Sequence, residues 1–254
     1  MDLKYLDDAV PKVVDEWYSP TLGQAMPIVI YGNFGHPLLL FPTAAADFLE
    51  NERFFLVKAI EPQILAGKVR VFSINSINSQ AWMDRNLPVV EQARRQALYA
   101  RYIEDEVVPY IRNACRTPDI RIATSGASFG GFHAMNTLCR RPDLFDAAIA
   151  MSGFYDLGPD YFKGYSDDNC YFNNPAWYVP NIAGHYLELL QRSCRIHILT
   201  GQGDYEAPDA SRGFSDILNG RGIPHLLEVW GHDVNHDWPW WRKMLPYSIE
   251  RMGW

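Results

Sequence analysis

The sequence predicts an α/β fold, with helices on both faces of one mostly parallel, doubly wound sheet. Short runs rich in β-branched and apolar residues alternate with segments whose apolar residues recur at helical spacing, which is the order of elements that a parallel sheet requires. The 254 residues are enough for one sizeable core, and no repeat, low-complexity tract or long linker divides them. We therefore expect a single domain over residues 1–254.

Each expected element follows from its local pattern. Apolar runs bounded by turn residues predict strands at 27–31, 37–41, 69–74, 120–124, 147–152, 195–200 and 224–230. Helical spacing predicts helices at 52–66, 88–112, 129–141, 208–220 and 238–252. Pro109 should kink or end the second of these helices, because proline lacks a backbone donor and clashes with the preceding turn. Residues 153–193 show no clear period, and we expect an irregular, aromatic-rich insert there.

Charge and composition exclude several classes of partner. The formal net charge of −7 argues against nucleic acid or an anionic membrane surface, since both need a basic face. No stretch approaches about 18 uninterrupted apolar residues, and no apolar run follows a basic N-terminal stretch, so we expect neither a membrane span nor a secretory signal. The four cysteines lack zinc-site and disulfide-scaffold spacing, which predicts reduced thiols in a cytoplasmic protein. The oligomeric state stays open.

Gly126, Ser128 and Gly130 form a G-x-S-x-G pattern directly after an expected strand and directly before an expected helix. This context is typical of a nucleophile elbow. The serine would sit on a strained turn, and the two glycines would let neighbouring backbone pass close by. Its oxygen would lie at the N-terminus of the helix, whose dipole favours developing negative charge. We therefore predict that Ser128 is a catalytic nucleophile.

An acid and then a histidine should follow the serine, each after a later strand. Asp204 and Glu206 both follow the expected strand at 195–200; Asp204 fits the shorter turn, so we favour it and keep Glu206 as the alternative. The acid would orient the imidazole and stabilise its charged form. His232 and His236 both follow the last expected strand. We favour His236 as the general base, because the loop must carry the imidazole back over the serine.

Two backbone N–H groups should bind the oxyanion that develops during acyl transfer. One is expected from Phe129, directly after the nucleophile. The other is expected from the small residues after the second strand, where we choose Ala44 and keep Thr43 as the alternative. This chemistry requires neither a cofactor nor a metal. Among the remaining histidines, His36 and His133 are candidates for the rim of the pocket, and the others are expected to be structural.

With these residues in place, the chain resembles an esterase branch of the α/β-hydrolases that includes esterase D, the enterochelin esterases and the antigen 85 mycolyltransferases. The resemblance runs from about Trp17 to the C-terminus. Within this branch, the chain is similar to a group of bacterial esterase-like proteins. It rests on the segments at 41–43, 125–133, 164–173 and 229–241. It implies the α/β-hydrolase fold and a serine esterase.

The resemblance also bears on the individual residues. Similar esterases have tryptophan at the second and fifth positions after the catalytic histidine, and Trp238 and Trp241 stand there for His236. Val234 and Asp237 occupy the same positions after His232, which favours His236. The oxyanion loop departs from the family pattern. Many relatives have His-Gly before the second donor, and this chain has a Phe-Pro-Thr segment at 41–43, which leaves the identity of that donor open.

The insert at 153–193 is expected to roof the active site. Its many aromatic rings would suit an apolar or aromatic group of an ester; the alternative is that the rings pack an insert without regular structure. Trp82, in the loop after the strand at 69–74, could reach the same cleft. The acidic run at 167–169 lacks EF-hand spacing, so we interpret it as turn-forming.

Together these features predict a serine carboxylesterase that hydrolyses small acyl esters through a Ser-His-Asp triad and an acyl-enzyme. An acyltransferase or a thioesterase on the same triad is the alternative, because the acyl-enzyme is common to all of them. A metal-dependent hydrolase using His232 and His236 is disfavoured, since Gly231 and Pro239 make their segment a loop. A non-catalytic binding protein is disfavoured by the intact serine, acid and histidine in the required order.

Overall fold

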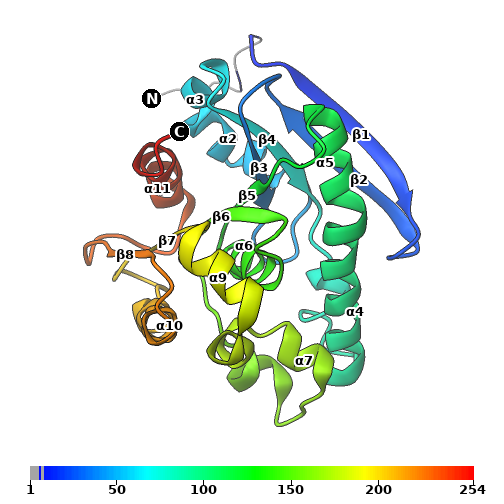
Figure 1. Cartoon of the computed structure of the whole chain (residues 1–254), viewed down its shortest axis with the longest axis vertical. Helices are drawn as coiled ribbons and strands as arrows, with labels where there is room; N and C mark the ends of the chain where they lie inside the picture. Colours follow the sequence, from blue (N-terminus) through cyan, green and yellow to red (C-terminus); the bar gives the residue numbers. More distant parts are fainter. Residues whose placement is uncertain (1–5, 7–8) are drawn as a thin grey trace.

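The computed structural model describes residue 6 and residues 9–254, and the remaining residues of the expected domain, 1–5, 7 and 8, lie outside the described part. Its centre is one eight-stranded sheet in the order β1-β2-β4-β3-β5-β6-β7-β8 (Figure 1). The strands are β1 (Lys12–Ser19), β2 (Gln24–Tyr31), β3 (His36–Phe41), β4 (Val69–Ile74), β5 (Ile122–Ala127), β6 (Phe145–Met151), β7 (Arg195–Thr200) and β8 (Leu226–Val229). The predicted mostly parallel α/β sheet is confirmed.

From β4 to β8 in the sheet order each neighbouring pair of strands is parallel, whereas β1 pairs with β2, and β2 with β4, in antiparallel fashion at one edge. Parallel strands end at the same edge of a sheet, so the loops that follow β3, β5, β6, β7 and β8 meet there. The sequence predicts every strand except β1. Most of β1 is exposed, including Val13 and Val14, and its sequence lacks the longer apolar run from which the other strands are predicted.

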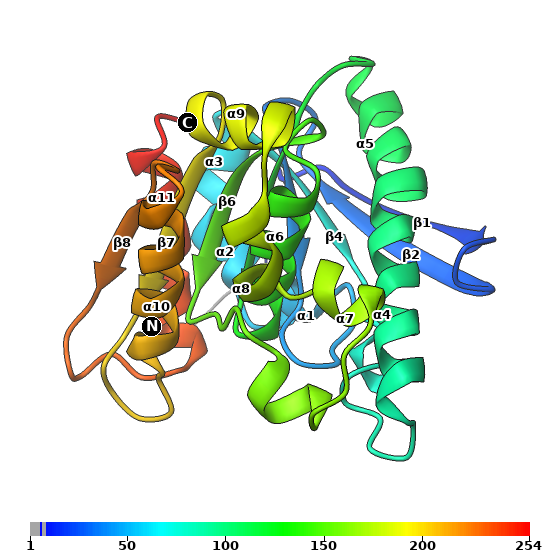
Figure 2. The ribbon, with the colours of Figure 1, turned by 60° about the horizontal axis from the view of Figure 1, so that its bottom comes forward.

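Helices cover both faces of the sheet. The longer ones are α4 (Val89–Tyr102), α5 (Val108–Cys115), α6 (Phe129–Arg140), α9 (Gly184–Arg192), α10 (Pro208–Gly220) and α11 (Trp238–Arg251). The shorter ones are α1 (Glu50–Arg53), α2 (Leu56–Ala59), α3 (Glu61–Leu65), α7 (Asp168–Phe172) and α8 (Pro175–Tyr178), with single turns η1 (Asn78–Gln80), η2 (Ile103–Val107), η3 (Gly158–Phe162) and η4 (Val179–Asn181). Figure 2 shows α4 and α5 beside β2 and β4, and α10 beside β7.

Side-chain alternation along the central strands divides the core into two layers. In β3, Leu39 and Phe41 point into the layer that α4, α5, α6, α9 and α10 cover. Leu38 and Leu40 point into the opposite layer, which α2 and α11 cover. Successive side chains of a strand face opposite sides, so a strand buried on both faces is apolar throughout, as β3 is.

Three predicted segments differ in detail. The expected helix at 52–66 is three short helices, because Phe55 adopts a left-handed conformation with φ of 62° between the first two. The helix expected at 88–112 continues past Pro109, because the wider turn η2 precedes it and Pro109 falls in the first turn of α5. The insert at 153–193 is not irregular throughout: it contains η3, α7, α8, η4 and α9. Within the described residues, no helix combines the length and apolar character that crossing a bilayer requires.

Candidate active site

Ser128 lies between the last residue of β5 and the first residue of α6, as the sequence predicts. Its backbone has φ of 56° and ψ of −122°, a region that residues with a side chain rarely adopt. Its N–H donates to the Met151 carbonyl of the neighbouring strand over 2.9 Å. The sharp turn is therefore anchored to β6, and Ser128 stands at the carboxyl edge of the parallel strands.

The glycines around the serine are required by close backbone contact. A Cβ atom on Gly126 would collide with the backbone of Gly130, and one on Gly130 would lie 2.7 Å from the carbonyl oxygen of Phe41. A Cβ atom on Gly131 would approach Gly153 and the Met151 carbonyl to 3.2 Å. The elbow therefore brings α6 against β3 and β6 at distances that only glycine allows.

Glu206 is the carboxylate that the structure brings to His236. Its Oε2 atom lies 3.8 Å from Nδ1 of His236, and its side chain is fully buried. Ser152 donates a hydrogen bond to Oε1 over 2.5 Å, and Thr200 donates to Oε2 over 3.0 Å. Burial raises the pKa of Glu206, but the interactions with His236, Ser152 and Thr200 lower it more, so the pKa lies below its ordinary value. The carboxylate is thus held in its charged form beside the imidazole.

The favoured acid of the sequence analysis, Asp204, occupies a different place. Asp204 is exposed, and it meets His236 through its backbone: its carbonyl accepts the His236 N–H over 2.9 Å. The Asp204 N–H donates a hydrogen bond to Oδ1 of Asn235 over 2.8 Å. The structure therefore brings Glu206, the alternative, rather than Asp204 to the imidazole, and Asp204 contacts the histidine loop through its main chain.

The physical reason lies in the packing of two loops. Gly201 and Gly203 follow β7, and a Cβ atom on either would overlap Val234 or Asn235 of the loop after β8. The Gly203 N–H donates to the Val234 carbonyl over 2.8 Å. With the two loops in such close contact, the chain runs outward at Asp204 and returns inward, so that the Glu206 side chain reaches the sheet edge.

Ser152 and Trp241 complete the polar cluster, and the sequence analysis assigned no role to Ser152. Ser152 follows β6 with φ of 48°, and its N–H donates to the Leu199 carbonyl of β7 over 2.7 Å. The indole Nε1–H of Trp241 donates to the Ser152 hydroxyl over 2.9 Å. The Trp241 ring also meets the His236 ring edge to face, with centroids 5.1 Å apart. The tryptophan at the fifth position after the histidine therefore contacts both the base and the group that holds the acid.

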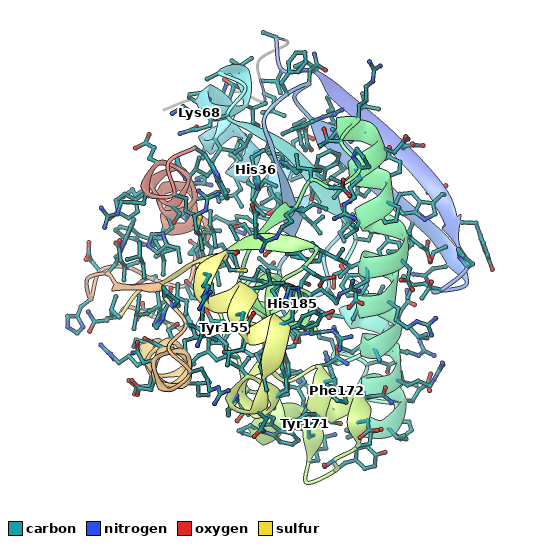
Figure 3. The ribbon with its side chains drawn as sticks, viewed as in Figure 1. His36, Lys68, Tyr155, Tyr171, Phe172 and His185 are labelled. Carbon is teal, nitrogen blue, oxygen red and sulfur yellow. The ribbon has the colours of Figure 1, made fainter. Side chains whose placement is uncertain are left out.

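The other histidines of interest lie elsewhere. His232 is exposed on the loop after β8. His36 begins β3, at the opposite end of the strand from the elbow, where it pairs with Asp146 over 3.0 Å and stacks on Trp254. Figure 3 shows His36 far from Tyr171 and Phe172 of the insert, so its expected place at the pocket rim is wrong.

In the oxyanion loop, the Thr43 N–H already donates a hydrogen bond within the protein, whereas Ala44 is held in place by hydrogen bonds to its carbonyl. The Thr43 N–H donates to Glu50 over 2.7 Å, which disfavours Thr43, the alternative donor. Ala44 has φ of 38°, and its carbonyl accepts hydrogen bonds from Asn78 Nδ2 over 2.5 Å and from Ser76 Oγ over 3.2 Å. These bonds fix the strained Ala44 conformation. Phe129 is the first residue of α6, where N–H groups have no acceptor inside the helix.

A buried histidine, His133, supports the oxyanion loop through Asn78. His133 of α6 lies 3.1 Å through Nε2 from Oδ1 of Asn78, whose amide holds Ala44. Burial lowers the pKa of His133 to about 3, so the ring is neutral at physiological pH. A neutral ring that donates from Nε2 fixes the Asn78 amide so that its nitrogen faces Ala44. The expected rim residue is therefore a buried support, 2% exposed.

On its other side Ser128 adjoins aromatic rings. Phe129 meets Phe154 and Tyr161 of the insert edge to face, with centroids 4.9 and 5.6 Å apart. Trp82 packs on Tyr161 at 6.2 Å, so the loop after β4 reaches the same cluster. Other rings of the insert serve elsewhere: Tyr155, labelled in Figure 3, stacks on Phe214 of α10 in the core. Some aromatic rings of the insert therefore lie near the serine, and others pack in the core.

Among residue 6 and residues 9–254, no group of three or more histidine, cysteine, aspartate or glutamate side chains is arranged to hold a metal ion. The fold places the Glu206–His236 pair and Ser128, on its strained turn, at the same edge of the sheet. A strained serine after β5, a buried carboxylate after β7 and an imidazole after β8 are suited to nucleophilic acyl transfer.

Comparison with known proteins finds a family model that covers more than half of the chain. Residues 66–252 match the model of the Esterase family, described as "Putative esterase". No curated protein matches the chain.

Solved structures show the same fold at low sequence identity. A ferulic acid esterase is 19% identical with a TM-score of 0.73, over 96% of this chain and 99% of that one. An S-formylglutathione hydrolase from Agrobacterium tumefaciens is 15% identical with a TM-score of 0.73, over 97% of both chains. MPT51 of Mycobacterium tuberculosis is 17% identical with a TM-score of 0.66, over 95% of this chain and 97% of that one. At these identities the likeness concerns the fold.

Proposed function

Because the chain belongs to the Esterase family, we propose that it is a serine hydrolase that hydrolyses small carboxylic esters with Ser128 as nucleophile, His236 as general base and Glu206 as acid. The observation that carries this proposal is the fully buried Glu206 carboxylate, which lies 3.8 Å from His236. That distance exceeds a hydrogen bond, and catalytic contacts commonly tighten only when substrate binds. The earlier expectation of a Ser-His-Asp triad becomes Ser-His-Glu.

In the acylation step, His236 takes the Ser128 proton as the serine oxygen attacks the ester carbonyl carbon. Glu206 accepts from Nδ1, which leaves Nε2 to receive that proton and stabilises the imidazolium. The carbonyl oxygen becomes an oxyanion, for which we assign the Phe129 and Ala44 N–H groups as donors. The intermediate then collapses, the ester C–O bond breaks, and His236 gives its proton to the leaving alcohol.

Deacylation repeats these roles with water. His236 takes a proton from the water that attacks the acyl-enzyme carbonyl, the Ser128–acyl bond breaks, and the proton returns to Ser128. The carboxylic acid leaves. Small acyl groups are favoured in this proposal because the rings of Phe129, Phe154 and Tyr161 crowd the elbow.

The test is turnover of p-nitrophenyl acetate and butyrate by the wild type and by Ser128→Ala. Removing a triad nucleophile typically lowers kcat by about 10⁶. A fluorophosphonate probe should label the wild type at Ser128 and leave the variant unlabelled. Unchanged turnover by folded, pure Ser128→Ala, or labelling of another residue, would overturn the assignment.

A further inference from the structure

A cavity of about 450 Å³ adjoins the aromatic side of the site. It is bounded by the loop after η1, the first turn of α4 and the turn η3. Its lining residues are Trp82, Arg85, Gln92, Asp160, Tyr161 and Lys163. Tyr161 forms one wall and contacts Phe129, the residue after the nucleophile, with ring centroids 5.6 Å apart. The Tyr161 ring therefore lies between the cavity and Phe129, the proposed oxyanion donor of the elbow.

Ala44, the other proposed oxyanion donor, is connected through Asn78 to the segment that forms one wall of the cavity. Asn78 in η1 donates to the Ala44 carbonyl, and the segment that carries Trp82 and Arg85 follows it directly. Gln92 of α4 donates from Nε2 to the Asp84 carbonyl over 2.7 Å, which ties that segment to the helix. An ester held at the two donors could therefore extend one of its groups into the cavity.

Two lining cations of the cavity form no ion pair with any described residue. Arg85 and Lys163 are exposed, and within the described part of the chain neither forms an ion pair or a side-chain hydrogen bond. By contrast, Arg94 and Arg95 on the adjacent α4 both pair with Glu91, at 2.7 and 2.9 Å.

The remaining lining groups leave the cavity with an excess of positive charge. Asp160 is its only carboxylate against the two cations. A ligand with acceptor oxygens and negative charge would supply what these two cations lack.

We propose that this cavity binds a carboxylate carried by the substrate, so that the preferred esters are anionic ones. The inference rests on the proposed esterase function, because it takes the scissile carbonyl to lie at Ser128. Arg85 can hold a carboxylate by two parallel hydrogen bonds, and Lys163 acts as a point charge. Both cations are exposed, so each contributes modestly and their effect weakens as salt is added.

The experiment compares charged and neutral methyl esters of equal chain length. Monomethyl succinate, glutarate and adipate are set against methyl butanoate, pentanoate and hexanoate, with acid release followed at constant pH. A second pair, 4-acetoxybutanoate against butyl acetate, places the carboxylate on the alcohol side. We expect kcat/KM to favour the charged ester by about tenfold in at least one pair, mainly through KM, since modest charge-assisted contacts at two cations have that size.

Variants assign the preference to the cavity. Arg85→Gln and Lys163→Gln should each lower the charged-to-neutral ratio of kcat/KM by about threefold to fivefold, and Asp160→Asn should raise it. Arg94→Gln is the matched control, because it removes an exposed arginine that does not line this cavity, and it should leave the ratio unchanged.

Equal kcat/KM for charged and neutral esters at every length, with neutral esters still hydrolysed, would overturn the subsite and leave the esterase intact. A preference that survives the Arg85 and Lys163 changes would overturn it as well. If no ester is hydrolysed and Ser128 takes up no fluorophosphonate, the proposed function fails together with the subsite.

Discussion

The two sides of Ser128 are built by different forces. On one side, Glu206, Ser152 and Trp241 form a buried network in which each polar group has a partner at hydrogen-bond distance. On the other side, Phe129, Phe154 and Tyr161 meet only by ring contacts. Buried polar groups cost free energy unless every one is satisfied, whereas apolar rings tolerate repacking.

This difference separates chemistry from selectivity. The polar side fixes the charge and orientation of the imidazole, so changes there should lower kcat. The aromatic side shapes the space around the ester, so changes there should act mainly on KM and on the choice of substrate. The predictions below test that division, beginning with the largest expected effect.

His236→Ala should lower kcat by about 10⁶, as removal of the base of a serine triad does. His232→Ala is the matched control, since this histidine lies on the same loop but is exposed. Steady-state turnover of p-nitrophenyl acetate by both variants checks the prediction. An inactive His232→Ala beside an active His236→Ala would contradict it.

Glu206→Gln should lower kcat by up to about 10⁴, because a neutral amide favours the wrong imidazole tautomer and does not stabilise the imidazolium. Asp204→Asn should have a far smaller effect, since Asp204 contacts the histidine loop through its backbone carbonyl. The two variants are compared on one substrate at one pH. The reverse ranking would restore Asp204 as the acid.

Trp241→Phe should lower kcat by about tenfold, the size of a hydrogen bond lost next to a charged group. Phenylalanine keeps an aromatic ring near His236 but removes the Nε1–H that donates to Ser152. KM should change little. Trp238→Phe is the control, because Trp238 packs on Trp241 and Phe54 without reaching the acid. An equal loss in both variants would reduce the role of Trp241 to packing.

Tyr161→Leu should change KM for p-nitrophenyl esters by a few-fold and leave kcat nearly constant, because it replaces one apolar wall by another of smaller area. A panel of acyl chain lengths measures the effect. A loss of kcat as large as that of Trp241→Phe would show that the two sides of the serine are not separable.

The smallest expected effect is on acid stability. The pKa of Glu206 is lowered in the folded state, so its contribution to the free energy of unfolding is present above the unfolded pKa, about 4.3, and is lost as pH falls through the folded pKa. The difference in unfolding free energy between wild type and Glu206→Gln should therefore shrink as pH falls below that value. Urea unfolding at several pH values measures it, and a difference that grows in acid would contradict the sign.

The sequence by itself determined the parts of this protein that depend on neighbours in the chain. Apolar runs predicted β2 to β8, helical spacing predicted α4, α5, α6, α10 and α11, and the elbow around Ser128 is a local strand-turn-helix pattern. The same pattern predicted which strands the acid and the histidine follow. These features are local because the periods of strands and helices are set by the backbone.

Tertiary structure decided which carboxylate faces His236 and what supports it. Asp204 and Glu206 lie on one loop, and only the packing of Gly201 and Gly203 against the loop after β8 turns Glu206 inward. The bond between Trp241 and Ser152 joins residues 89 positions apart. No local period encodes such contacts, because they depend on where separate strands end, and so the direction of a loop side chain is fixed only when the sheet edge is assembled.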